Sequence, residues 1–214
     1  MSKSKKILST LLALVLCVSL GATAHAADPG AFKTEPATDE WIYLHIVDQG
    51  ITVYAPVSDA MKYVDASNGP TKAQALSDLI SNPYISVTEL DSSLFAAAPA
   101  DSDVIEVEPV PARSPGTWTI TPHFVPSGGT TQYGPHDISW GEVLAFQMIA
   151  AAAHSLGWSC ATSLPYLAPI ATQAGVSVIF CGLTSGSYYV YVKNFDQYDM
   201  TVTGGSVQVY TPEG

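Results

Sequence analysis

The chain has 214 residues, of which 47% are hydrophobic and 13% charged, with a formal net charge of −11 at pH 7. This length is enough for one sizeable domain or two small ones. The acidic balance argues against binding to the phosphate backbone of nucleic acids and against adsorption to an anionic membrane surface. We therefore expect no nucleic-acid partner.

The first 26 residues are a predicted signal peptide. Three lysines open the chain, residues 7–22 are apolar, and Ala24-His25-Ala26 is a small-x-small cleavage signal. The alternative, a retained membrane anchor, is disfavoured because Ser and Gly interrupt the apolar run, which leads straight into that signal. Cleavage leaves five basic residues against nineteen acidic ones, a formal net charge of −14. No later segment is long and apolar enough to span a bilayer, so we expect a secreted, extracellular protein.

Two cysteines remain after processing, Cys160 and Cys181. An even pair in a secreted chain allows one internal disulfide. Closing a loop of about twenty residues would contribute roughly 3 kcal/mol to stability in the chain-entropy model. The alternative is a pair of buried thiols that act as small hydrophobic side chains.

The first part of the mature chain predicts a leader and then a hairpin. Residues 27–40 are small, polar and proline-containing, which is typical of a flexible leader. The β-rich runs 41–47 and 51–56 follow, joined by Asp48-Gln49-Gly50. Two such runs around a glycine-containing turn predict an antiparallel hairpin.

A helix and a third strand complete a predicted small α+β unit over residues 41–95. The sequence Thr71-Lys72-Ala73-Gln74 has the pattern of a capping box ahead of an apolar periodicity, and Asn82-Pro83 ends the helix. Residues 84–90 then predict a strand.

Residues 96–115 form a predicted linker rich in proline, alanine and acidic residues. Within it, residues 104–110 alternate apolar side chains with glutamates and are either an edge strand or extended linker. Fourteen acidic residues lie in 27–113 and five in 114–214, and this change of composition supports a domain boundary near residues 113–116.

Residues 116–211 are β-rich, with turn signals at regular intervals. The centre of this region is 186–194, where Tyr188 and alternate residues lie on one face and Tyr189, Tyr191 and Lys193 on the other. A second β-rich run, 200–210, follows a polar hexamer, and we expect the two to pair as an antiparallel hairpin. A bulge at Gly204-Gly205 would restore the valines of that run to one face.

The stretch from Trp140 to Ala153 is ambiguous. Ser139 and Glu142 could cap a helix, which local propensity favours. Leu144, Phe146 and Met148 could equally form one face of a strand.

Taken in order, Gly141-Glu142 with its apolar run, 186–194, and Val202-Thr203-Gly204 with Val207 resemble the bacterial pre-peptidase C-terminal-like β-sandwich. The same pattern is similar to related sandwiches of small secreted proteins from Gram-positive bacteria. The resemblance covers roughly residues 114–211. It implies a non-catalytic jelly-roll or Ig-like sandwich that helps secreted proteins fold, stay attached or bind, and it favours a strand over residues 140–153. The expected fold is therefore mainly β, with an antiparallel sandwich after the small α+β unit.

No specific catalytic motif occurs in the sequence. It has no G-x-S-x-G elbow, H-E-x-x-H, phosphate-binding loop or dinucleotide fingerprint. Four histidines remain in the mature chain and are scattered, so they predict no local metal site. They leave open a hydrolase whose site lies between the two halves and combines a histidine with aspartates. These histidines are His45, His123, His136 and His154.

Oxygen-rich loops suggest one candidate cation. Asn194, Asp196 and Asp199 follow the tyrosine-rich strand, and Asp101 with Asp103 lies in the linker. Calcium needs six to eight oxygen ligands, and neither segment supplies that many alone. Calcium is the only cofactor that the sequence suggests, and solvated loop acids are the alternative.

Tyr189 and Tyr191 are the candidate ligand-binding residues, because alternate tyrosines on an outer strand face would stack side by side. Such tyrosines suit carbohydrate rings or protein partners, and the alternative is packing against a neighbouring strand. The sequence thus predicts a secreted, non-catalytic binding or adhesion protein for a cell-surface or host macromolecule. The alternatives are the hydrolase and an accessory or inhibitor domain for a co-secreted partner.

Overall fold

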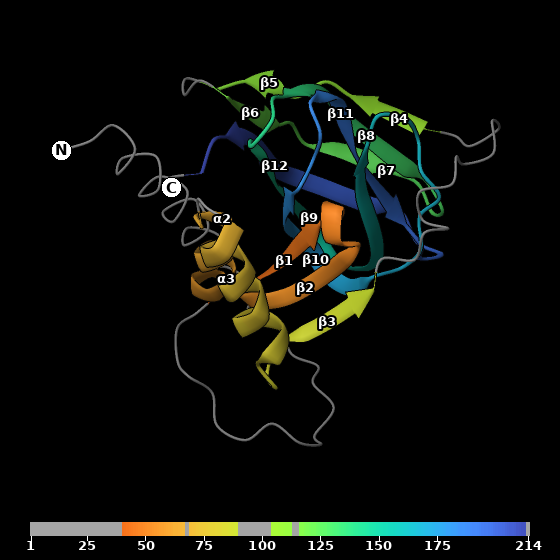
Figure 1. Cartoon of the computed structure of the whole chain (residues 1–214). Coiled ribbons are helices and arrows are strands. Elements are labelled where there is room, and N and C mark those ends of the chain that lie inside the picture. The colour runs from red at the N-terminus through yellow and green to blue at the C-terminus, as the bar shows by residue number, and fades with distance from the viewer. Residues whose placement is uncertain (1–39, 67–68, 90–103, 113–115, 213–214) are drawn as a thin grey trace.

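The computed structural model describes residues 40–66, 69–89, 104–112 and 116–212. The predicted signal peptide, the leader up to residue 39 and linker residues 96–103 and 113–115, which include Asp101 and Asp103, lie outside these ranges. The described chain is mainly β, with a large mixed sheet and a small helical unit (Figure 1), which confirms the predicted fold class.

The N-terminal hairpin, the helix and the third strand are confirmed. Strands β1 (Trp41–Ile46) and β2 (Ile51–Pro56) pair antiparallel around the 3-10 turn η1 (Val47–Gln49). Strand β3 (Ser86–Glu89) pairs with the other side of β2. Helix α3 (Gly69–Ser81) begins two residues before the predicted cap.

A second helix, α2 (Val57–Val64), was not predicted from the sequence. Its signals are Pro56 immediately before the first turn, Asp59 in the first turn and Lys62 in the last. It buries Ala60, Tyr63 and Val64, which are spaced three and four residues apart, as on one face of a helix.

Strand β1 joins the small unit to the sandwich through backbone hydrogen bonds. It runs parallel to β10 (Ala171–Cys181), with Tyr43 opposite Val178 and Ile46 opposite Cys181. The sheet therefore contains strands from both predicted units. Its strand order is β3-β2-β1-β10, followed by β9 (Val143–Ala161), β11 (Gly186–Asn194), β8 (Thr130–Ile138) and β4 (Val104–Val107).

The ambiguous stretch after Trp140 is a strand, as the resemblance favoured. Strand β9 (Val143–Ala161) runs for 19 residues and pairs with β10 on one side. On its other side, residues 143–150 pair with β12 (Met200–Tyr210), and residues 156–161 pair with β11 (Gly186–Asn194). A strand that changes partner along its length forms a corner of the sandwich.

The predicted hairpin between the tyrosine-rich strand and the last strand is wrong. Strand β11 lies between β8 (Thr130–Ile138) and β9, whereas β12 pairs with β9, β6 and β7. The physical reason is the length of β9, because one of its edges pairs with β11 along residues 156–161 and with β12 along residues 143–150. The β11–β12 connection consequently leads from one segment of that edge to the next and does not fold back as a tight turn.

The predicted bulge in the last strand is confirmed. The register of β12 against β9 shifts between Val202 and Gly204. Met200, Val202 and Val207 are buried as a result, and Val209 is half-buried.

The remaining strands include the edges of the sheet. Residues 104–110, for which the sequence allowed an edge strand, begin with β4 (Val104–Val107), which runs parallel to β8. Strand β8 was not predicted, and it contains Gly134-Pro135, two residue types that are unfavourable inside a strand. The others are β5 (Val110–Pro111), β6 (Thr117–Ile120) and β7 (His123–Val125).

Two hydrophobic cores lie on opposite faces of the shared sheet. Ile42, Leu44 and Ile46 of β1 face the two helices and pack with Tyr63 and Leu79. The alternate β1 residues face the sandwich, where a larger core is formed mainly by β8 to β12. Neither helix in the described ranges is long and apolar enough to cross a membrane.

Candidate functional site

The predicted tyrosine face is only partly present. Tyr189 is half-buried, but Tyr191 is buried, with 2% of its surface exposed. Burial, with smaller effects from Tyr189 and Cys160, raises the pKa of Tyr191 to about 12. The expectation of two exposed tyrosines is therefore wrong for Tyr191. Of the pair, Tyr189 alone is accessible to a ligand, and its role in binding stays a prediction.

The loop after β11 is built around Asn194, which is fully buried. Its side-chain amide donates to the carbonyl oxygens of Tyr198, at 2.7 Å, and Pro126, at 3.4 Å. Its side-chain oxygen accepts the backbone N–H of Asp196 at 3.1 Å. One amide thus holds both ends of the loop and ties the loop to the turn after β7.

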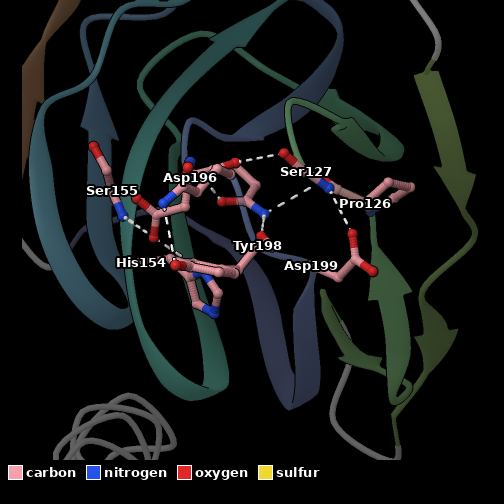
Figure 2. Close-up of polar contacts among 9 residues, drawn as sticks. Pro126, Ser127, His154, Ser155, Asp196, Tyr198 and Asp199 are labelled. Carbon is pink, nitrogen blue, oxygen red and sulfur yellow. Dashed lines mark hydrogen bonds and ion pairs between the residues drawn. The ribbon is translucent and has the colours of Figure 1, made fainter.

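Two aspartates fasten the same loop to neighbouring elements, as Figure 2 shows. Asp196 Oδ2 accepts the backbone N–H of Ser155 at 3.1 Å and lies 3.2 Å from Nδ1 of the buried His154. Asp196 Oδ2 and His154 Nδ1 are thus within ion-pair distance, although they are not aligned as a hydrogen bond. Asp199 Oδ1 accepts the backbone N–H of Ser127 at 2.9 Å, and the Ser127 hydroxyl donates to the Asp196 carbonyl.

These contacts bear on the predicted calcium site. An oxygen of each of Asn194, Asp196 and Asp199 accepts a backbone N–H, from a different residue in each case. In the described part of the chain, no group of three or more His, Cys, Asp or Glu side chains could hold a metal ion. Calcium at this loop stays a prediction, which thermal unfolding with calcium and with chelator would test.

Asn194→Ala is expected to lower the free energy of unfolding by about 2 kcal/mol, because it leaves the Tyr198 carbonyl and the Asp196 amide without their partner. Denaturant unfolding measures this loss. The matched control is Gln197→Ala in the same loop, whose side chain is exposed and bonds the Tyr198 hydroxyl. A change within about 0.5 kcal/mol is expected there. Equal effects of the two substitutions would contradict this role of Asn194.

The two cysteines are free thiols, and both are buried. Cys160 belongs to the sandwich core and Cys181 to the core beneath the helices. The disulfide proposed from the sequence is therefore not formed in the structure, and the alternative of buried hydrophobic thiols describes it. The two side chains face opposite sides of the sheet. Because Cys160 lies on β9 and Cys181 on β10, the alternation of side chains along either strand alone could not reveal this.

The four histidines are separated, and two of them are buried away from any carboxylate partner. His45 accepts a hydrogen bond at Nε2 from the indole N–H of Trp158 at 3.1 Å, and burial lowers its pKa to about 3. Neither ring nitrogen of the buried His136 has a hydrogen-bond partner. Burial lowers the pKa of His136 to about 4, although the nearby Asp137 charge opposes this shift.

Of the other two histidines, His123 is half-buried and His154 is buried. His123 hydrogen-bonds the Tyr133 hydroxyl and the Thr121 carbonyl. His154 faces Asp196, which is the histidine–carboxylate pairing that a hydrolase would use. The hydroxyl of Ser127 nearby donates to a backbone carbonyl and is not presented to His154.

An aromatic row that sequence reasoning missed lies on the sandwich-facing side of the N-terminal hairpin. We use this name for Trp41, Tyr54 and Tyr43, whose successive ring centroids are 5.1 and 4.5 Å apart. The row continues inward to Trp158, whose ring meets Tyr43 edge-on at 4.9 Å. Trp41 is 37% exposed and the two tyrosines are half-buried, so the row extends from solvent into the core.

The row arises from strand alternation and pairing. Trp41 and Tyr43 are alternate residues of β1, and Tyr54 lies opposite Tyr43 in β2. Burial, with a smaller effect from Tyr54, raises the pKa of Tyr43 to about 12, so its hydroxyl stays neutral at physiological pH. Closely spaced rings with neutral hydroxyls offer an apolar surface with hydrogen-bonding groups, which suits sugar rings or protein side chains.

The similarities of this chain to known proteins lie in solved structures. No protein-family model matches it, and no curated protein sequence matches it. A similar solved structure is the periplasmic lysozyme inhibitor of g-type lysozyme from Aeromonas hydrophila, with a TM-score of 0.38 and 11% identity over 51% of this chain and 99% of that one. Another is the pre-peptidase C-terminal domain of collagenase from Bacillus anthracis, with a TM-score of 0.34 and 14% identity over 53% of this chain and 100% of that one.

These similarities are remote. The second of these structures is a pre-peptidase C-terminal domain, the kind of β-sandwich that the sequence resembles. The similarities assign the chain to no family and indicate no ligand.

Proposed function

We propose that this protein is a secreted, non-catalytic binding protein that recognises an extracellular protein or carbohydrate. The observation that carries the proposal is the aromatic row, in which three adjacent rings lead from the surface toward the core. Partly exposed aromatic side chains supply a large contact area at little cost in conformational entropy. An accessory or inhibitor role beside a co-secreted partner is one form of this function.

The secreted location rests on the predicted signal peptide and on the acidic mature chain. The hydrolase alternative keeps one observation in its favour, the closeness of His154 and Asp196. Activity screening on peptide, ester and glycoside substrates separates the two functions, and turnover lost in His154→Ala would favour the hydrolase.

The binding proposal predicts that Trp41→Ala combined with Tyr54→Ala weakens ligand binding by at least about tenfold, because it removes the two outer rings of the row. The measurement is a glycan-array screen and a pull-down from extracellular material, followed by titration of each hit.

Two variants serve as comparisons in that experiment. Trp140→Ala removes a tryptophan that is 87% exposed and outside the row, and binding should not change. Tyr189→Ala tests the surface predicted from the sequence. If Tyr189→Ala abolished binding while the row variant bound normally, the ligand surface would lie on β11 and the row would have no role.

A further inference from the structure

Strand β3 forms an open end of the large sheet. Its residues Ser86–Glu89 are all exposed and pair with β2 on one side. Among the described residues, no strand pairs with its other side (Figure 1). The backbone N–H and C=O groups along that side can therefore hydrogen-bond an additional strand.

Strand β3 has two of the features that protect edge strands, a length of four residues and the charged side chain of Glu89, and it lacks three others. Residues 86–89 contain neither lysine nor proline, and their register with residues 51–54 of β2 is continuous, without a bulge. Proteins commonly place such features on exposed edges to prevent pairing with other chains. The β3 edge is therefore able to pair with a strand of complementary charge over these four residues.

Apolar side chains border the edge. On the face that carries the aromatic row, Tyr54 lies opposite Ser86 in the β2–β3 register. Val87 faces the helix side and is 40% exposed, and Ile80 and Tyr84 in the preceding segment are 51% and 77% exposed. Successive side chains of an added strand would point to opposite faces, beside Val87 on one face and beside Ser86 and Thr88 on the other.

The charged side chain of β3 is negative. It belongs to Glu89, which is exposed. The lysines of this unit are engaged elsewhere: Lys62 pairs with Asp59 at 2.7 Å, and Lys72 lies over the Tyr63 ring at 4.9 Å from its centroid. An edge with an acidic end, on a chain with a formal net charge of −11, is complementary to a strand in which apolar and basic residues alternate.

We propose that the β3 edge binds an extended segment of a partner protein, with alternating apolar and Lys or Arg residues, as an added β-strand. This proposal rests on the proposed binding function and specifies its partner as a protein. A second copy of this chain is the less suitable occupant, because it would bring Glu89 and a further net charge of −11 to an acidic surface.

The test uses synthetic peptides of about eight residues, the length of an ordinary strand. One alternates lysine with valine, a second alternates glutamate with valine, and a third is the lysine peptide with proline in place of alternate valines. The lysine–valine peptide is expected to bind and to slow hydrogen exchange of the backbone amides of residues 86–89. The glutamate peptide lacks the complementary charge and the proline peptide lacks the backbone donors, so neither should bind.

Val87→Lys is expected to weaken binding of the lysine–valine peptide by at least about tenfold, because it adds a like charge and removes an apolar contact at the edge. The matched control is Val110→Lys in the edge strand β5, where the valine is also exposed and binding should be unchanged. Binding without protection of residues 86–89, or equal binding by both variants, would overturn the proposal. So would a dimer in analytical ultracentrifugation that Val87→Lys dissociates, since it would make a second copy the occupant.

Failure of this proposal and failure of the proposed function give different results. If no peptide binds but the Trp41→Ala, Tyr54→Ala variant loses a natural ligand, only the edge proposal falls. If the peptide binds at the edge and no natural ligand depends on the aromatic row, only the role of the row falls.

Discussion

Replacing Trp158 by alanine is expected to lower the free energy of unfolding by about 3–5 kcal/mol, the usual range for deleting a large aromatic side chain from a core. Trp158 is 2% exposed and lies on β9 within the sandwich core. Its ring packs against Tyr43, and its indole N–H bonds His45, both on β1. Truncation would therefore create a cavity and also leave the buried Nε2 of His45 without a donor.

Denaturant unfolding of two further variants separates these contributions. Trp158→Phe keeps most of the ring volume and removes the indole donor, so a loss of about 1–3 kcal/mol is expected from the unpartnered His45. Trp140→Ala is the matched control, because Trp140 is 87% exposed in the β8–β9 connection and should contribute less than about 0.5 kcal/mol. Comparable losses in Trp158→Ala and Trp140→Ala would show that Trp158 does not connect β9 to β1.

The contact between Trp158 and His45 could not be predicted from the sequence, whereas several local features could. Alternation and turn residues are local, and they correctly indicated the β1–β2 hairpin, helix α3 and the bulge in β12. Trp158 and His45 are 113 residues apart, and their contact depends on the parallel pairing of β1 with β10, for which the sequence has no local signal. The aromatic row, by contrast, lies within the predicted β1–β2 hairpin, where placing Tyr43 opposite Tyr54 could have found it.

The errors about the candidate site follow from pairing rather than from local structure. Residues 186–194 were correctly identified as a strand, but the neighbours of that strand decide whether its outer face is exposed. Strand β11 pairs with β8 and β9 in place of the expected β12, and Tyr191 is buried in this arrangement. Asn194 was predicted as a cation ligand because an amide oxygen suits calcium, and its buried hydrogen bonds to the adjoining loop could not be inferred from spacing.

Lowering the pH from 6.5 toward 4 is expected to destabilise the protein through His45 and His136. Both are buried and neutral, and their native pKa values of about 3 and about 4 lie below the value of about 6.5 for an unfolded chain. Below pH 6.5 the unfolded state therefore binds protons that the native state does not, and the free energy of unfolding falls as the pH falls. Each histidine contributes up to about 1.4 kcal/mol per pH unit, until the pH reaches its native pKa.

His136→Phe isolates one of these two contributions. His136 has no hydrogen-bond partner, and its ring packs edge-on to that of Trp118, with 4.6 Å between the ring centroids. Phenylalanine therefore removes the proton-binding group without leaving a hydrogen-bonding group unpaired. The variant is expected to show roughly half the wild-type dependence of unfolding free energy on pH between 6 and 5, before most carboxylates titrate. Denaturant titrations at each pH measure the slope, with pH 8 as the reference at which both histidines are neutral in either state. If wild type and variant had the same slope, the native state would be accepting a proton at His136, and the buried side chain would have to find a partner or water on protonation.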